Sequence, residues 1–194
     1  MSTRLPAAAR REQLLAVALA VFAREGFHGT AMNDVADAAG VTKPVLYQHF
    51  RSKRELYLAL LEEVGSRLRD TIAKATVEAG TPHAQVERGF LAYFRWVADD
   101  RAAFLLLFGG GAKRDEQFAE AVRRNETAIA DAIAPLIQAD IDPEHQRNLA
   151  YGLVGLAEAT SRRLVQAGID FDPEQVAKQM SELAWAGLRG VRRV

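Results

Sequence analysis

The fold is decided by the stretch GVTKPVLYQHFRSKREL, residues 40–56, in which Pro44 stands where a run of helical residues begins. Thr42 is a plausible helix N-cap, so Pro44 falls in the first helical turn. Proline costs no hydrogen bond there, because the leading N–H groups of a helix have no intrahelical partner. The stretch therefore predicts a short helix, followed by a long one that begins at Lys53.

A second short helix precedes this one. Thr30 stands before the sequence AMNDVADAAG as its predicted N-cap, and Gly40 is the predicted end of the helix. A longer first helix is expected to stop at Gly26. Two short helices joined by Ala-Gly-Val-Thr indicate a helix-turn-helix, in which the second helix enters the major groove of DNA and the first braces it.

The short helix that contains Pro44 has two faces. Leu46 and Phe50 are spaced i,i+4 and are expected to pack inward. Lysine and glutamine suit base edges or phosphates, a proline ring suits a thymine methyl, and a tyrosine hydroxyl suits a phosphate. Lys53 is placed to neutralise a phosphate, although a lysine there opposes the helix dipole. The outward residues form one arc, which consists of Lys43, Pro44, Tyr47 and Gln48.

Charge is distributed unevenly along the chain. The 194 residues contain 25 Lys and Arg and 25 Asp and Glu, so the net charge is zero. Residues 1–54 nevertheless carry eight bases against four acids, a net charge of +4, whereas residues 55–188 carry 14 bases against 21 acids, a net charge of −7. We call residues 1–54 the head and the rest of the chain the body. A basic head on an acidic body is expected if only the head binds a polyanion.

Composition favours an all-α fold with about nine helices. Alanine, leucine, glutamate and arginine dominate, and no stretch alternates apolar with polar residues long enough to predict a strand. The chain has no cysteine, which excludes disulfides, thiolate nucleophiles and cysteine zinc sites. No signal-peptide core and no apolar window of roughly 20 residues occurs. We expect a soluble, cytoplasmic protein without a metal or cofactor and without a membrane partner.

Residues 26–61, GFHGTAMNDVADAAGVTKPVLYQHFRSKRELYLALL, contain in order a glycine-threonine, a short helix, glycine-valine-threonine, leucine-tyrosine-x-histidine-phenylalanine and serine-lysine. This pattern resembles the DNA-binding domain of TetR-family transcriptional repressors, and the likeness runs from about Leu14 to Leu61. It implies an all-helical homodimer with a DNA-binding domain at residues 1–52 and a ligand-binding and dimerisation domain at residues 53–194.

The resemblance also implies a mode of action. The two heads bind a palindromic DNA operator, and a small-molecule effector in the body changes their separation and releases the repressor. By this likeness eight positions face DNA, namely Thr30, Thr42, Lys43, Pro44, Tyr47, Gln48, His49 and Lys53.

Ligand-contacting residues in the body have to be argued from the sequence itself. Asn125 lies on an apolar helical stripe, where its amide needs either a ligand or a backbone carbonyl as partner. Glu158 contacts either a ligand or Arg162 one turn later. Aromatic residues on adjoining helices form plain core or line an apolar cavity for an apolar effector. The aromatic candidates are Phe90, Phe94, Phe104, Phe108 and Phe118.

The last two helices, residues 143–167 and 173–190, are rich in alanine and glycine, which permits close helix packing. They suit either an internal hairpin or half of a four-helix dimer bundle, and the family likeness favours the dimer. The larger residues expected at this dimer interface are Leu149, Leu153, Leu156, Leu183, Trp185 and Leu188.

Two other classes of protein compete with a repressor. A helical enzyme is the main rival, but His83 and His145 are the histidines outside the head, and neither a HExxH pattern nor a nucleophile elbow occurs, so no catalytic residue is identifiable. An interaction module whose helix-turn-helix is only structural would leave the outward arc unexplained. We therefore expect a ligand-responsive repressor and no enzymatic activity.

Overall fold

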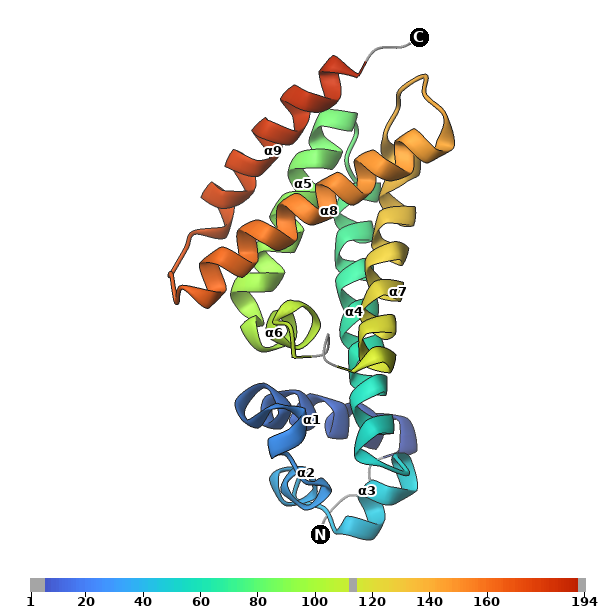
Figure 1. The fold of residues 1–194 in the computed structure, drawn as a ribbon, viewed down its shortest axis with the longest axis vertical. Helices are drawn as coiled ribbons and strands as arrows, with labels where there is room; N and C mark the ends of the chain where they lie inside the picture. Colours follow the sequence, from blue (N-terminus) through green and yellow to red (C-terminus); the bar gives the residue numbers. More distant parts are fainter. Residues whose placement is uncertain (1–5, 112–114, 192–194) are drawn as a thin grey trace. The chain divides into compact units, whose positions relative to one another are not determined.

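The computed structural model describes residues 6–111 and 115–191, and in these residues it contains nine α-helices, one 3-10 helix and no strand (Figure 1). The all-α prediction is confirmed. No helix of the described chain is long and apolar enough to cross a membrane. In chain order the elements are α1 (Ala7–Gly29), α2 (Met32–Ala38), α3 (Lys43–His49), α4 (Lys53–Val77), α5 (Pro82–Asp99), α6 (Arg101–Phe108), α7 (Glu116–Ile133), η2 (Ala134–Leu136), α8 (Pro143–Gln166) and α9 (Pro173–Gly190).

The described residues form two compact units. The first unit holds the residues up to Val64 together with those from Ala102 to Ala121, and the second holds those from Gly65 to Arg101 and from Val122 onward. The helices α4 and α7 therefore contribute to both units. The predicted boundary between residues 52 and 53 separates a DNA-binding part from a ligand-binding and dimerisation part, whereas these units are defined by compactness. The boundary stays a prediction.

The end of α1 differs from the sequence expectation in one detail. Gly26 has φ 71°, a conformation that favours glycine, so the backbone is kinked at the predicted stop, but α1 continues to Gly29. The predicted N-cap Thr30 is wrong by one residue, because Ala31 is the N-cap of α2. Thr30 is instead buried, and its hydroxyl donates to the carbonyl of Gly26 at 2.8 Å. The carboxylate of Asp34 accepts from the Ala31 N–H at 2.7 Å and supplies the missing cap.

The turn between α2 and α3 is a Schellman motif. Gly40 has φ 64°, and its N–H donates to the carbonyl of Asp37 at 3.1 Å. The N–H of Val41 donates to the carbonyl of Ala36 at 3.0 Å. This turn ends α2 at the predicted glycine and fixes the direction in which the chain enters α3.

The helix α3 has the two faces that the sequence predicts. Leu46 and Phe50 are 0% and 1% exposed, so the inward face is confirmed. Thr42 is the N-cap residue, and Pro44 lies in the first turn, where its missing N–H leaves no bond unmade. Ser52 then caps α4, because its hydroxyl accepts from the N–H of Glu55 at 3.1 Å.

An aromatic cluster forms part of the core of the first unit. The rings of Phe27 and Tyr57 lie 5.1 Å apart, and the ring of Phe118 lies 4.8 Å and 4.6 Å from them. Arg54 lies 5.0 Å from the Phe118 ring and donates two hydrogen bonds, at 2.9 and 2.6 Å, to the carboxylate of Asp115. Burial in this cluster raises the pKa of Tyr57 to about 12. These contacts hold α1, α4 and the beginning of α7 together.

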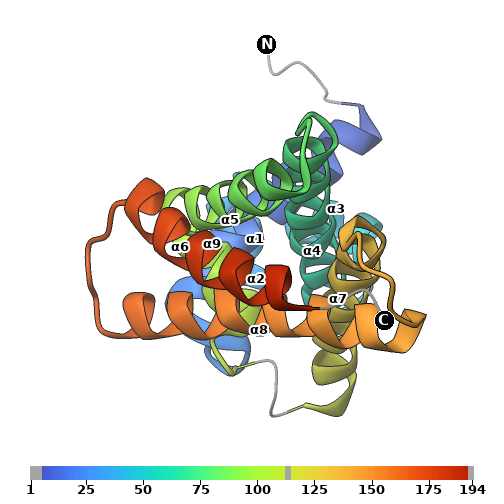
Figure 2. The same cartoon turned by 90° about the horizontal axis from the view of Figure 1, so that it is seen from above.

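In the second unit α9 packs along α5, and α8 contacts both helices (Figures 1 and 2). The helices α8 and α9 each begin at an Asp-Pro pair, Asp142-Pro143 and Asp172-Pro173. The carboxylate of Asp142 accepts from the N–H of His145, and that of Asp172 accepts from the N–H of Glu174, each at 2.9 Å. These caps satisfy N–H groups that the first helical turn leaves unpaired.

A close approach between α4 and α7 occurs at Gly65. A Cβ atom on Gly65 would lie 2.2 Å from Oδ1 of Asn125, so no larger side chain fits without a shift. Asn125 is 2% exposed, and its Oδ1 accepts from Nη1 of Arg69 at 2.6 Å. The amide expected to need a partner therefore has one in the Arg69 side chain.

Replacing Gly65 with alanine should destabilise the protein. The added Cβ forces the helix or the Asn125 amide to move, and we expect the free energy of unfolding to fall by about 1–3 kcal/mol. Gly89→Ala in α5 is the matched control, because it gains the same helix propensity while its Cβ would lie 3.4 Å from Cγ2 of Thr76. Urea unfolding measures the difference, and equal stability of the two variants would contradict the close approach.

Candidate functional site

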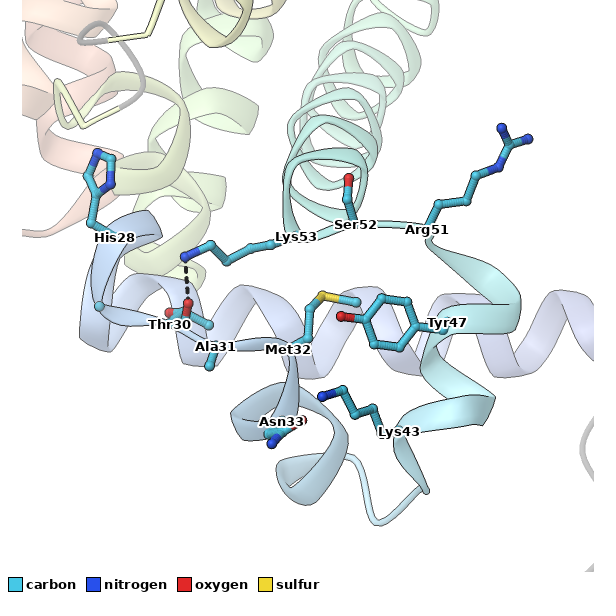
Figure 3. A pocket seen from close by; sticks show the side chains of 11 residues that line it. His28, Thr30, Ala31, Met32, Asn33, Lys43, Tyr47, Arg51, Ser52 and Lys53 are labelled. Carbon is cyan, nitrogen blue, oxygen red and sulfur yellow. Dashed lines mark hydrogen bonds between the residues drawn. The ribbon is translucent and has the colours of Figure 1, made fainter.

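An open hollow with a volume of about 570 Å³ lies in the first unit (Figure 3). The end of α1, the start of α2, α3 and the start of α4 all contribute to its lining. Four of the residues expected to face DNA line this hollow, namely Thr30, Lys43, Tyr47 and Lys53. Residues separated by up to 23 positions in the sequence are thus brought to one surface.

The outward arc of α3 is exposed as predicted. Lys43, Pro44, Tyr47 and Gln48 are all exposed, with 40% of Tyr47 accessible. Nζ of Lys43 lies 5.9 Å from the centroid of the Tyr47 ring, within range of a cation–π contact. In Figure 3 the Lys43 side chain points toward Asn33, and the Tyr47 hydroxyl points toward Met32. A positive charge and a hydroxyl therefore lie at the surface, where phosphate oxygens could reach them.

The two flanking candidates differ in accessibility. Thr42 is exposed at the start of α3, and its side chain makes no cap hydrogen bond to the described residues. His49 is half-buried, with its ring 6.4 Å from that of Phe50. Contact of these residues with DNA stays a prediction.

Lys53 has partners within the protein. Its Nζ donates to the carbonyl of Thr30 at 2.7 Å (Figure 3). It also donates to the carbonyl of Phe27 at 2.7 Å and lies 4.6 Å from the centroid of the Phe27 ring. These carbonyls lie at the end of α1, where a cation is favourable. The charge that opposes the dipole of α4 thus stabilises the end of α1. An ammonium has three donors, and two of them are used by these carbonyls of the described residues.

The aromatic ligand candidates are buried in both units. In the first unit, Phe104 and Phe108 have ring centroids 5.4 Å apart, and Phe118 belongs to the aromatic cluster with Phe27 and Tyr57. In the second unit, Phe90 and Phe94 have ring centroids 6.2 Å apart. Each of these ring contacts lies within one unit. Contact of these phenylalanines with a ligand stays a prediction.

The polar ligand candidates both have partners in the second unit. Asn125 accepts from Arg69, and the carboxylate of Glu158 accepts from the guanidinium of Arg162, which confirms the expected ion pair. Sequence reasoning did not select Ser161, which is 0% exposed in α8. A serine facing inward three residues after Glu158 was the signal that could have identified it. No group of three or more His, Asp and Glu side chains suited to a metal occurs within residues 6–111 and 115–191.

The dimer candidates are mostly half-buried in their own protomer. Leu149, Leu153 and Leu188 pack against the buried cluster around Ala150. Leu156 is half-buried, and the ring of Trp185 lies 4.9 Å from that of His83. Leu183 is 59% exposed. Their participation in a dimer stays a prediction.

The chain matches two family models. One, described as "Bacterial regulatory proteins, tetR family", matches residues 14–60, and the other, described as "Tetracyclin repressor-like, C-terminal domain", matches residues 82–187. The chain is 33% identical over 190 residues to the HTH-type transcriptional activator FasR of Mycolicibacterium smegmatis, covering 97% of this chain and 87% of that protein. It is 27% identical over 188 residues to the HTH-type transcriptional repressor KstR2 of the same organism, covering 93% and 91%.

The fold also matches solved structures. One is the transcriptional regulator FadR from Bacillus subtilis in complex with stearoyl-CoA, with a TM-score of 0.78. The match covers 91% of this chain and 98% of that chain at 16% identity. At this identity the likeness concerns the fold alone.

Replacing Lys53 with methionine should weaken the first unit even without DNA. The variant keeps the apolar stem but loses both bonds to the carbonyls of Phe27 and Thr30, and we expect a loss of about 1–3 kcal/mol in the free energy of unfolding. Lys74→Met, at an exposed position near the end of the same helix, is the control and should have a smaller effect. Thermal and urea unfolding measure both, and an unchanged stability of Lys53→Met would contradict the structural role of this ammonium.

Proposed function

Because the chain belongs to the TetR family of bacterial transcriptional regulators, we propose that it is a ligand-responsive repressor that binds a palindromic DNA operator as a homodimer. The observation that carries the proposal is the exposed arc of α3 beside an open hollow lined by Lys43 and Lys53. DNA binding places the proposed regulator in the cytoplasm. The named relatives include an activator and a repressor. Transcript levels of the regulated genes in cells with and without the gene for this protein therefore test whether it represses or activates transcription.

The proposed binding mode assigns a role to each exposed residue. The α3 helices of two protomers enter major grooves about one DNA turn apart, roughly 34–36 Å. Lys43 and Gln48 read base edges, and the Pro44 ring meets a thymine methyl. Tyr47 contacts a phosphate through its hydroxyl, and Lys53 contributes its third donor to another. Thr42 and His49 contact the flanking backbone, whereas Thr30 acts through the buried turn that it stabilises.

The proposed dimer interface is the exposed face of α8 and α9. Tyr151, Gly152, Gly155 and Ala159 are exposed along α8, and Leu183 is exposed on α9. A Cβ atom on Gly152 or Gly155 would meet nothing within 4 Å, so packing within the protomer does not require glycine there. Close approach of a partner helix would require it, which supports a four-helix dimer bundle. Leu149, Leu153, Leu156, Trp185 and Leu188 then support this face from behind.

The proposed effector is an apolar small molecule that binds in the body and releases DNA. Buried phenylalanines in both units support an apolar ligand. The fold is shared with a regulator solved with stearoyl-CoA, which makes a fatty acyl compound the first candidate. Release requires the effector to prefer the DNA-incompetent state by a coupling free energy of about 1–3 kcal/mol. The helix α4 belongs to both units and is the proposed lever between them.

DNA recognition is tested by selecting binding sites from a random DNA pool. We expect a palindromic site with half-sites about one helical turn apart. Tyr47→Phe should weaken binding to every sequence, because one hydrogen bond to a phosphate is lost, and should leave the slope of log affinity against log salt unchanged, because the lost hydroxyl carries no charge. Gln48→Ala should instead relax the preference at one base pair, by about 1–3 kcal/mol.

Lys74→Ala is the control for these DNA-binding variants, since Lys74 is exposed near the end of α4 and has no proposed role in binding. Fluorescence anisotropy over a salt series measures all three variants. Normal affinity of Tyr47→Phe for every sequence would rule out the phosphate assignment, and the absence of any selected sequence would contradict the proposed function.

Dimerisation is tested by adding charge or bulk to the exposed face. Leu183→Glu and Gly155→Arg should each produce a monomer in light scattering. Operator affinity should fall more than tenfold in each variant, because a monomer contacts only one half-site and binds it weakly. Val77→Glu is the matched control, since Val77 is an apolar residue that is 81% exposed on α4 outside the face. Dimers of unchanged affinity in both test variants would place the interface elsewhere.

A further inference from the structure

Three polar groups lie together inside the second unit. They are the hydroxyl of Tyr93 on α5, the hydroxyl of Ser161 on α8 and the Nε–H of Arg162 on α8. Tyr93 is 7% exposed and Ser161 is 0% exposed. All three polar atoms are buried and have no hydrogen-bond partner among the residues that the structure describes. Buried polar groups in proteins are nearly always paired, so this cluster requires an explanation.

The three groups are close enough to influence one another. Burial raises the pKa of the Tyr93 phenol, and the Ser161 hydroxyl and the Arg162 charge act in the opposite direction. Their atoms nevertheless do not meet the geometry of a hydrogen bond. Each unpaired group destabilises the folded chain by about 1–3 kcal/mol, a cost that phenylalanine and alanine would avoid. A partner from outside the chain would remove this cost.

The electrostatics of the cluster indicate what kind of atom fits. The guanidinium of Arg162 is held by the Glu158 carboxylate, which fixes its orientation and offsets its charge. The cluster therefore offers up to three donors, from a phenol, an alcohol and a guanidinium. A carbonyl or carboxylate oxygen accepts from such donors and brings no proton that would compete with them.

Aromatic side chains lie beside the ring of Tyr93. The Tyr93 ring packs edge-on against Phe94 with centroids 5.4 Å apart, and Phe90 precedes Phe94 by one turn of α5. The rings of Tyr93 and Trp96 lie 6.2 Å apart. A molecule with its oxygen at the polar cluster would thus have aromatic side chains beside its hydrocarbon part.

We propose that Tyr93, Ser161 and Arg162 bind the carbonyl or carboxylate oxygen of the effector, with its hydrocarbon part against Phe90 and Phe94. The inference rests on the proposed function and deepens it by naming the ligand class, an acyl chain that ends in a hydrogen-bond acceptor. Such a chain is available as a free fatty acid or as its thioester. Glu158 is a positioning residue in this site, because it acts through Arg162.

The experiment removes one hydroxyl at a time from the full chain, after copurified lipids have been extracted. Tyr93→Phe and Ser161→Ala are the test variants. Ser181→Ala is the matched control, because Ser181 is 2% exposed and its hydroxyl already donates to the carbonyl of Lys178 at 3.0 Å. Each protein is measured for the Tm of the ligand-free form and for its affinity toward sodium stearate and stearoyl-CoA by calorimetry.

We expect the ligand-free Tm of Tyr93→Phe and Ser161→Ala to equal or exceed that of the original chain, since each variant removes an unpaired group. Affinity for the bound probe should fall about 3- to 10-fold in each, which corresponds to the loss of one hydrogen bond. Ser181→Ala should lower the Tm and leave affinity unchanged. The probe that binds more tightly identifies the free acid or the thioester as the source of the acyl chain.

Three results would overturn the inference. The first is a ligand-free Tm of Tyr93→Phe or Ser161→Ala that falls as far as in Ser181→Ala, because the hydroxyl would then have an internal partner such as a buried water. The second is unchanged affinity in both test variants. The third is an original chain that binds selected DNA but neither probe, which refutes the acyl ligand while the DNA-binding function stands. Probe binding that depends on Tyr93 in a chain that selects no DNA would support the inference and refute the proposed function.

Discussion

Hydrogen bonds of the Lys53 ammonium connect the two ends of the helix-turn-helix. This ammonium joins the first residue of α4 to the carbonyls of Phe27 and Thr30 at the end of α1, and the whole helix-turn-helix lies between these two points of the chain. The position of α3 therefore depends on a contact outside α3 itself. Any movement of the first turn of α4 therefore acts on both ends of the helix-turn-helix. This gives α4, the proposed lever, a physical connection to the outward arc of α3.

Buried polar groups of the second unit differ in whether they have a hydrogen-bond partner within the described chain. Asn125 is paired with Arg69 where α4 and α7 approach at Gly65, so its amide contributes to packing. Tyr93 and Ser161 are also buried, but their hydroxyls lack a hydrogen-bond partner among the described residues. This contrast separates polar residues that the fold satisfies from those that a ligand would satisfy. It explains why the effector proposal rests on the second group rather than on Asn125.

The family of the chain and the chemistry of its effector depend on different residues. The family models and FasR establish a transcriptional regulator with a helix-turn-helix head. The same fold at 16% identity in FadR shows that the architecture tolerates extensive change in its residues. Effector choice therefore has to be argued from the side chains of this chain, because regulators that share the fold need not share the ligand.

Features that depend on neighbours within about four residues were determined by the sequence alone. The two faces of α3, the glycine that kinks α1, the glycine that ends α2, and the Asp-Pro caps of α8 and α9 all follow from local periodicity and backbone preference. Only the tertiary structure decided the partners of Lys53, the burial of Thr30 and the meeting of Tyr93 with Ser161. These contacts join residues from 23 to 68 positions apart, and burial, rather than local propensity, determines which distant groups meet.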